Sequence, residues 1–475
     1  MQTGIKFRCY PTREQERILL RWIGCQRHVY NSKVREDRYF RTFARKALSL
    51  TGQHGPIDQK YAHFIGEGAE WLREVPSVVL RNGAVLWKQA YARFFKGLAG
   101  RPAVHTRYGK QSVWLTNELF RFEGVTDDLS EVSARRLVIG TRKHPVGEIA
   151  FVAHRDYRIP ASIHVAIEAG QWFVSFSNDE EGNPEVKPEE TAEWLASFTR
   201  DELMRRTQGL DRGVVISAAA SDGQDFHFSE THSRRLAYCN RQAKRWQRIA
   251  ARRTKGGQNQ RKAHQRVARY KQAQANIRRE FAHQTSHALV ADPRHLLFVF
   301  EALKVKNMTR SAVGTLAKPG KKVAQKTGLN RSILESAWGK TKQYTEYKAR
   351  RARKLAVEVP PINSSRECGV CGHVHEDNRV SQSEFVCQAC GHSENADRNA
   401  ARVIQARGVD LVRSGNWKAK ERIRCAITKS VGRDSPKPAP ATEPTPTEFI
   451  VRREGHSALA QGTSKWEALA TARRA

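Results

Sequence analysis

The apolar positions of the first hundred residues recur at helical spacing. Between residues 13 and 40 they are Ile18, Leu19, Trp22, Ile23, Val29 and Tyr30, which predicts one amphipathic helix. A second helix is predicted from Ser77 to Gly100. The N-terminal part of the chain is therefore expected to contain a helical segment.

Two later segments have the pattern of β-strands. Residues 207–228 predict a strand that carries Asp211, a hairpin turn at Asp222 and Gly223, and a second strand. Residues 295–308 open with an apolar run that ends at Glu301. A continuous apolar run is typical of a buried central strand. An acid at the end of such a strand is costly unless it binds a metal ion.

Positive charge dominates the segment between Ser233 and His283. It contains sixteen Lys and Arg residues and a single acid, Glu280. The segment predicts two helices broken at the glycines of KGGQN, with a thin apolar stripe of Leu236, Trp246, Ile249, Val267 and Ile277. A solvated charged hairpin is one interpretation. Charge of one sign at this density repels itself, which favours contact with a nucleic-acid backbone. The candidate contacts are Arg241, Lys244, Arg245, Arg248, Arg252 and Arg253.

The composition of the whole chain agrees with a polyanionic partner. Its 475 residues include 83 Lys and Arg against 48 Asp and Glu, for a formal charge of +35, far more than solubility needs. The length suits two or three domains. The N-terminus is polar, without a signal peptide or an apolar span. We therefore expect a protein without a membrane anchor, located in a bacterial or archaeal cytosol or nucleoid.

Four cysteines have the spacing of a zinc ribbon. Cys368 and Cys371 form one CxxC pair, and Cys387 and Cys390 form a second pair 15 residues later. Two such turns place four thiolates around one tetrahedral ion, which leaves no open position and indicates a structural Zn²⁺. Disulfides or buried free thiols are the alternatives, and disulfides are rare in the cytosol.

An acid follows the second cysteine pair. Asp397 opens the predicted helix ADRNAARVIQARG. A two-metal nuclease needs several carboxylates that converge from separate elements. Taken singly, Asp211 could be a turn former, Glu301 the end of a strand and Asp397 a helix N-cap. Their order, from a strand, a second strand and then a helix, favours one shared metal site.

These motifs together resemble the TnpB family, the RNA-guided endonucleases encoded by insertion-sequence transposons, and are similar to compact type V CRISPR effectors. The matching segments are KFRCYPTREQERILLRWIGCQRHVYN, GLDRG, FEALKVKNM, GLNRSILESAWG, PPINSSRECGVCGH and NADRNAARVI. They occur in the order of the family and cover roughly residues 1–410.

The resemblance implies an α/β multidomain fold. Residues 1–204 would form a wedge β-barrel with a helical recognition insertion, whose helices lie at about 12–100. Residues 205–430 would form an RNase H-like, RuvC-like nuclease domain. That domain would contain the basic helical hairpin, 233–283, and the zinc ribbon, 364–394. Residues 431–475 are rich in Pro, Thr and Ala and are expected to form a disordered tail.

The resemblance also implies the activity. The chain would use a guide RNA to select target DNA beside a short flanking motif. Asp211, Glu301 and Asp397 would hold two Mg²⁺ ions for phosphodiester hydrolysis. Lys88 and Gln89 are candidates for reading the flanking motif, with a solvated helix face as the alternative. A monomer and a homodimer both remain possible.

Three other functions stay open. A nuclease-dead, RNA-guided DNA binder is disfavoured because all three acids are present. An RNA-independent DNA-binding transposition protein would need no guide. A compact type V CRISPR effector would use the same chemistry in another genetic setting.

Overall fold

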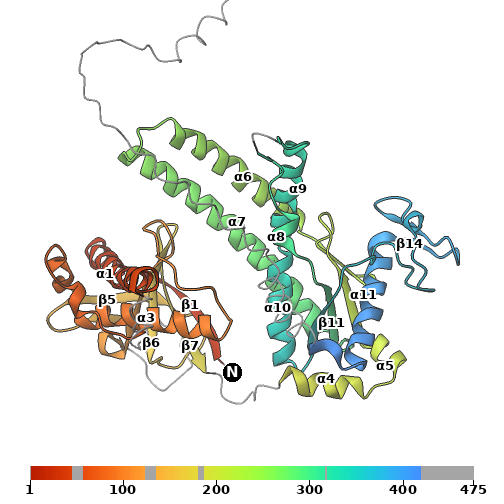
Figure 1. Cartoon of the computed structure of the whole chain (residues 1–475), viewed down its shortest axis with the longest axis horizontal. Helices are drawn as coiled ribbons and strands as arrows, with labels where there is room; N and C mark the ends of the chain where they lie inside the picture. Colours follow the sequence, from red (N-terminus) through yellow and green to blue (C-terminus); the bar gives the residue numbers. More distant parts are fainter. Residues whose placement is uncertain (1, 45–56, 124–134, 180–186, 316–317, 419–475) are drawn as a thin grey trace, which may run out of the picture. The chain divides into compact units, whose positions relative to one another are not determined.

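The structure is a computed structural model that describes residues 2–44, 57–123, 135–179, 187–315 and 318–418. The predicted tail, 431–475, and the end of the predicted nuclease domain, 419–430, lie outside the described residues. The described chain has an α/β fold with one sheet of seven strands, one of five and one of two. Figure 1 shows the elements coloured along the sequence.

The seven-stranded sheet is antiparallel throughout. Its strands are β1 (Gln2–Tyr10), β2 (Gln111–Thr116), β3 (Phe120–Glu123), β4 (Arg135–Gly140), β5 (Pro145–Val152), β6 (Ser162–Glu168) and β7 (Gln171–Asp179), in the order β2-β6-β7-β1-β5-β4-β3. In β1 the alternating residues Ile5, Phe7 and Cys9 are buried, as a strand with one covered face requires.

This sheet must be rolled. Its edge strands β2 and β3 are joined only by the 3₁₀ turn η4 (Asn117–Leu119), which spans at most about 15 Å. The edges of a flat sheet of this size would lie about 29 Å apart. All seven strands contribute side chains to one apolar cluster, which fills the inside of the roll.

Helices pack against this cluster. They are α1 (Arg13–Tyr39), α3 (Ser77–Phe95) and the short turn η3 (Glu70–Glu74), which contributes Leu72. The short helices η1 (Phe40–Ala44) and η2 (Ala62–Phe64) have no buried residue. The predicted first helix is confirmed, and a capping box of Thr12 and Gln15 begins it. The second ends at Phe95 rather than at Gly100. Buried Gln26 links α1 to its neighbours, because its Nε2 donates to the carbonyls of Val79 and Trp114 at 3.2 and 2.9 Å.

The five-stranded sheet is mixed. It contains β8 (Thr207–Asp211), β9 (Ala218–Ala220), β10 (Asp225–Phe226), β11 (Leu297–Glu301) and β12 (Leu355–Val359), in the order β10-β9-β8-β11-β12. Strands β8, β11 and β12 are parallel, and β9 and β10 are antiparallel to their neighbours. The predicted strands that end at Asp211 and Glu301 are thereby confirmed, as is the turn at Gly223, whose φ is +89°.

Both faces of this sheet are covered. On one face Leu297 and Val299 pack with α4 (Pro188–Ala196), α5 (Arg200–Arg205) and α11 (Ala396–Arg413). On the other face Phe298 and Phe300 pack with α7 (Gln258–Ala291) and α10 (Trp338–Arg351). Helices α4 and α5 precede residue 205, at which the sequence predicted the nuclease domain to begin, but they belong to the core of this sheet.

Two glycines let α11 lie close to the sheet. A Cβ on Gly209 of β8 would lie 2.1 Å from the carbonyl oxygen of Ala401 in α11. A Cβ on Gly408 of α11 would lie 2.2 Å from Cγ2 of Val299 in β11. Neither position has room for a side chain, so the backbone of α11 lies directly against the backbone of β8 and against the side chain of Val299 in β11.

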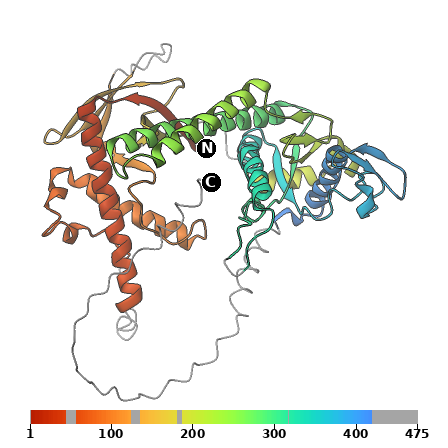
Figure 2. The ribbon, with the colours of Figure 1, turned by 90° about the horizontal axis from the view of Figure 1, so that it is seen from above.

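The basic segment forms the predicted helical hairpin. Its helices α6 (Glu230–Ala251) and α7 (Gln258–Ala291) run side by side (Figures 1 and 2). Of the predicted apolar stripe, Leu236 and Ile277 are buried, and Trp246, Ile249 and Val267 are half-buried. Alanines such as Ala243 and Ala263 are buried as well. Small side chains let the two helices approach while the long basic side chains stay outside.

The remaining elements are short. They are α8 (Val305–Met308) and α9 (Val323–Glu335), then the ribbon elements η5 (Glu376–Asn378), β13 (Glu384–Val386) and β14 (Ser393–Asn395), and finally η6 (Asn416–Lys418). Among the described helices, none has a stretch that is both long and apolar enough to cross a bilayer.

Candidate functional site

The structure brings the three predicted acids together. Asp211 is the last residue of β8, and Glu301 is the last residue of the neighbouring parallel strand β11. Parallel strands end at the same sheet edge, so both carboxylates lie there. Asp397 comes from the first turn of α11. All three line one cleft.

The carboxylates of this cleft repel one another. Burial, and then the nearby charges of Glu301 and Asp397, raise the pKa of Asp211 to about 7. Burial is also the main cause of a raised pKa at Asp397, where Arg379 acts in the opposite direction. Clustered acids with raised pKa values are typical of sites that hold cations or transfer protons.

The three acids are spaced more loosely than two other groups of potential metal ligands. Among the described residues, two groups of three or more metal-ligating atoms lie within 4.8 Å of one another, and the three acids form neither group. Their carboxylate oxygens are of the ligand type that Mg²⁺ prefers.

Asp397 is not the cap of its helix, which corrects one alternative interpretation. Asn395 is the N-cap, and its side chain accepts hydrogen bonds from the backbone N–H groups of Asp397 and Arg398 at 3.0 and 3.4 Å. The carboxylate of Asp397 is thus not used in capping and is directed into the cleft.

Several residues that sequence reasoning missed hold the acids in place. The Oγ of Ser364 donates to Oε1 of Glu301 at 2.5 Å. The buried guanidinium of Arg212 donates to the backbone oxygen of Glu301. The indole N–H of Trp338 donates to the carbonyl of Gly213 at 2.9 Å and so fixes the loop after Asp211. Arg212 lies within the segment GLDRG and Trp338 within GLNRSILESAWG, both of which resemble the family. Membership of these segments is the sequence feature that could have identified the two residues.

The segment between the two cysteine pairs contributes a cation to the cleft. Nη2 of Arg379 lies 3.7 Å from Oδ1 of Asp397, and Arg379 and Gln382 both line the cleft. No sequence motif marked them, because they lie between the two cysteine pairs and outside the segments that resemble the family. Arg379 is placed to balance the charge of the acids.

The four cysteines fit one zinc ion. Their Sγ atoms all lie within 4.8 Å of one another, with Cys368 and Cys390 at 3.8 Å and Cys371 and Cys387 at 3.6 Å. A tetrahedral site with Zn–S bonds of about 2.3 Å requires S–S distances of about 3.8 Å. Described cysteines outside this group, Cys9, Cys25 and Cys239, are buried and free.

A buried asparagine joins the ribbon to α11. Asn399 is fully buried, and its Nδ2 donates to the carbonyl of Glu367 at 2.7 Å. Its Oδ1 accepts from the backbone N–H of Gly369, inside the first CxxC turn, at 2.8 Å. The helix that carries Asp397 is therefore hydrogen-bonded directly to the first CxxC turn.

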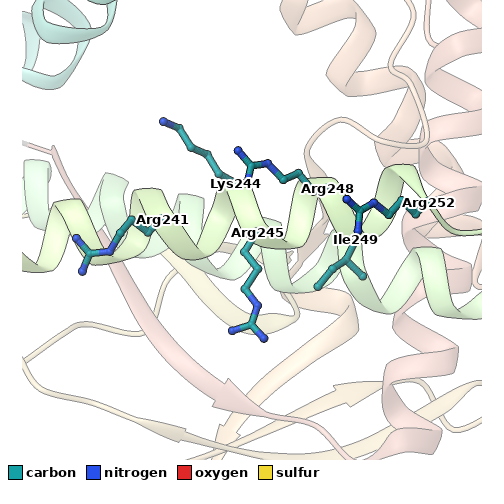
Figure 3. Close-up of a pocket in the computed structure, with 6 residues that line it drawn as sticks. All are labelled: Arg241, Lys244, Arg245, Arg248, Ile249 and Arg252. Carbon is teal, nitrogen blue, oxygen red and sulfur yellow. The ribbon is translucent and has the colours of Figure 1, made fainter. Parts of the chain in front are cut away.

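The basic residues of α6 form an exposed patch away from the acids. One pocket is lined by Arg241, Lys244, Arg245, Arg248, Ile249 and Arg252. Lys244 and Arg248 extend from one side of α6, and Arg245 and Ile249 from the other (Figure 3). These basic residues and Arg253 are exposed. Within the described ranges none of them forms an ion pair. Lys88 and Gln89 are exposed on α3.

Three family models match the chain. One described as "Cas12f1-like, TNB domain" covers residues 338–404, and one described as "Probable transposase" covers residues 185–312. A "Helix-turn-helix domain" covers residues 1–39, where the structure has a strand and one long helix.

Two full-length relatives carry the description "putative RNA-guided DNA endonuclease". InsQ of Escherichia coli (strain K12) is 30% identical over 432 residues, covering 87% of this chain and 94% of the relative. A protein of Streptomyces pristinaespiralis is 28% identical over 458 residues, covering 94% of this chain and 98% of the relative. A solved Cas12f1–sgRNA–target DNA complex has a TM-score of 0.49 at 12% identity, covering 85% of this chain and 98% of that one.

Proposed function

Because the chain belongs to the TnpB family of transposon-encoded RNA-guided DNA endonucleases, we propose that it cuts target DNA with a RuvC-like site of Asp211, Glu301 and Asp397. The single observation that carries this proposal is the convergence of the three acids in one cleft. The strand order β10-β9-β8-β11-β12, with β9 antiparallel to β8, supports an RNase H-like domain, since that fold places its first strand at the centre with an antiparallel second strand beside it.

The residues of the cleft have different proposed roles in the reaction. Asp211, Glu301 and Asp397 would hold two Mg²⁺, which when bound supply an activated water and charge stabilisation at the leaving 3′ oxygen. Ser364 and Arg212 hold Glu301 in position. Arg379 forms an ion pair with Asp397, and its guanidinium would also be placed to donate to a phosphate oxygen of the bound nucleic acid.

The structural zinc would be held by Cys368, Cys371, Cys387 and Cys390. Its place in the mechanism is indirect: the ribbon positions Arg379 and, through Asn399, the helix that carries Asp397.

Nucleic-acid binding is assigned to the basic hairpin and to the rolled sheet with its helices. The hairpin supplies Arg241, Lys244, Arg245, Arg248, Arg252 and Arg253 for phosphate contacts with guide RNA or target DNA. The rolled sheet supports the wedge β-barrel assignment, and Lys88 and Gln89 on α3 are the proposed readers of the flanking motif. Sequence selection then comes from base pairing with the guide.

The test of this function starts from the RNA that accompanies the protein. The chain is expressed with its native flanking DNA, purified, and the bound RNA is sequenced. We expect one dominant RNA with a constant structured part and a variable end that directs Mg²⁺-dependent cleavage of a matching DNA. Heterogeneous RNA that is lost in high salt would instead support the RNA-independent DNA-binding transposition protein.

The zinc ribbon is expected to be required for cleavage. Cys387→Ser should remove the ribbon's zinc and lower cleavage at least about 10²-fold, because metal binding and local folding are coupled and the ribbon positions Arg379 and α11. Metal analysis and cleavage rate measure the two effects. Cys239→Ser, in a buried cysteine of α6, is the matched control and should keep zinc and activity. Full zinc content in Cys387→Ser would refute the four-cysteine site.

The hairpin is expected to contribute a salt-dependent share of nucleic-acid affinity. Changing Arg241, Lys244, Arg245 and Arg248 together to Gln should lower the slope of log K against log[salt] by about 3, since each lost phosphate contact removes about 0.7–0.9. A control with the same loss of net charge replaces Arg452, Arg453, Arg473 and Arg474 with Gln. Equal effects of the two variants would show that only net charge matters.

A further inference from the structure

We propose that Asp222, Asp292 and His295 form an additional divalent-cation site, of the Zn²⁺ or Mn²⁺ class, at the edge of the five-stranded sheet opposite the catalytic acids. Asp222 lies in the turn between β9 and β10, where Ser221 pairs with Gly209 of β8. Asp292 and His295 lie between α7 and the first residue of β11. Asp211 and Glu301 lie at the other ends of β8 and β11.

Local hydrogen bonds aim the two carboxylates at each other. The backbone N–H of Gln224 donates to Oδ1 of Asp222 at 3.1 Å, and that of Arg294 donates to Oδ1 of Asp292 at 2.9 Å. One ligand atom from each of Asp222, Asp292 and His295 then lies within 4.8 Å of the others. Among the described residues, the four cysteines are the other group of potential metal ligands that meets this 4.8 Å limit.

The histidine provides the second, independent observation. His295 is 5% exposed, and its Nδ1 is buried without a hydrogen-bond partner. Nδ1 lies 3.5 Å from Oδ2 of Asp292, close enough to share a ligand without forming a hydrogen bond. Gln208 is 1% exposed, its Nε2 donates to Oδ2 of Asp222 at 3.0 Å, and its Oε1 is also buried without a partner. Each buried polar atom left unpaired costs about 1–3 kcal/mol.

Arg294 competes with a metal ion for these carboxylates. Its Nη2 lies 2.6 Å from Oδ2 of Asp292 and 4.0 Å from Oδ2 of Asp222. Arg294 donates its side-chain hydrogen bonds to Asp292 and none to His295. The Nδ1 atom of His295 therefore stays without a hydrogen-bond partner. The side chain of Arg294 is 63% exposed, so it can turn into solvent when a divalent ion binds.

The ligand set indicates the class of ion. One imidazole nitrogen and two carboxylate oxygens suit Zn²⁺ or Mn²⁺ better than Mg²⁺ or Ca²⁺, which prefer oxygen ligands alone. A bound ion would link the β9–β10 turn to the segment before β11. It would thereby brace the strands on both sides of β8 from the end of the sheet that takes no part in catalysis.

The experiment counts zinc in the full chain with its bound RNA. Equilibrium dialysis against micromolar Zn²⁺, followed by metal analysis, should show one equivalent beyond that of the ribbon in the wild type. Asp222→Asn and His295→Gln should each lose that equivalent and keep the ribbon's. Arg294→Gln should bind it about tenfold more tightly, which equals about 1.4 kcal/mol. Asp201→Asn, at an exposed acid of α5, should behave as wild type.

Zn²⁺ binding is expected to become tighter in Arg294→Gln and to be lost in Asp222→Asn and His295→Gln. This difference distinguishes a metal site from a structural network of ion pairs. In a network without metal, all three changes would lower stability and none would change zinc content, which would overturn the proposal. If the ligand variants fail to fold, unchanged zinc affinity in Arg294→Gln would overturn it by itself. Cleavage is not the readout, so failure here leaves the proposed nuclease function untouched.

Discussion

Asp211→Asn is expected to abolish cleavage and, at the same time, to stabilise the metal-free protein. Loss of this carboxylate removes a proposed ligand of the catalytic ions, and cleavage should fall by at least about 10³-fold, since a single electrostatic stabiliser alone is worth about 10²–10³. Guide RNA binding should persist, because Asp211 faces the cleft and not the basic hairpin. Single-turnover cleavage and RNA binding measure these two effects.

The gain in stability follows from the raised pKa of Asp211. Its pKa is about 7 in the folded chain and about 4 in an unfolded one. The folded protein therefore holds this proton more tightly, so stability falls as pH rises from about 4 to about 7 and stays reduced above. At pH 8 without Mg²⁺, Asp211→Asn should raise the free energy of unfolding by about 1–4 kcal/mol. At pH 4 the difference should vanish.

Asp201→Asn serves as the control for this pair of effects, because that acid is exposed on α5. It should change neither cleavage nor the pH dependence of unfolding. Retained cleavage in Asp211→Asn would exclude the three-acid site. Lost cleavage with lowered stability at pH 8 would show that the acid serves structure instead.

Gly209→Ala is expected to be among the most damaging single changes around the five-stranded sheet. The new methyl group would lie 2.1 Å from the carbonyl oxygen of Ala401 and 2.6 Å from the backbone nitrogen of Gln405. Both are backbone atoms of α11 and cannot rotate away. Overpacking of this kind costs about 3 kcal/mol or more. If α11 shifts by about 1 Å, Asp397 moves with it and cleavage should fall about 10²-fold.

Gly328→Ala is the matched control. Gly328 is exposed in the middle of α9, and a Cβ there would meet nothing within 4 Å. Alanine is the better helix former by about 1 kcal/mol, so this change should be neutral or stabilising. Thermal unfolding and cleavage of both variants test the close packing of α11. A fully active, stable Gly209→Ala protein would contradict it.

The acids could be predicted from the sequence because each lies at the end of a strand or at the start of a helix whose hydrophobic pattern is clear. Glu301 follows four apolar residues of a central strand, and Asp397 opens an amphipathic helix. Arg379, Ser364 and Trp338 could not be assigned in this way. They come from loops or helix starts, and their approach to the acids depends on packing between segments that are far apart in the chain.

Helix positions were predicted better than helix contacts. The basic hairpin and its break are confirmed. Trp246, Ile249 and Val267 of the predicted stripe are only half-buried, whereas Ala243, Ala250 and Ala263 are buried. A large apolar side chain is buried at a helix contact only where the facing helix leaves enough space for it. In a hairpin with long basic side chains on its outside, close helix approach selects small residues at the contact.

The position of α11 also sets when the protein can become active during its synthesis. Strands β8 and β11 leave the ribosome with Asp211 and Glu301, but their covering helix and Asp397 follow only at residues 396–413. Until then one face of the sheet lacks its cover and the cleft lacks an acid. If Asp397 is one of the catalytic acids, as proposed, a chain that ends before α11 would carry the basic hairpin without a complete acidic cleft.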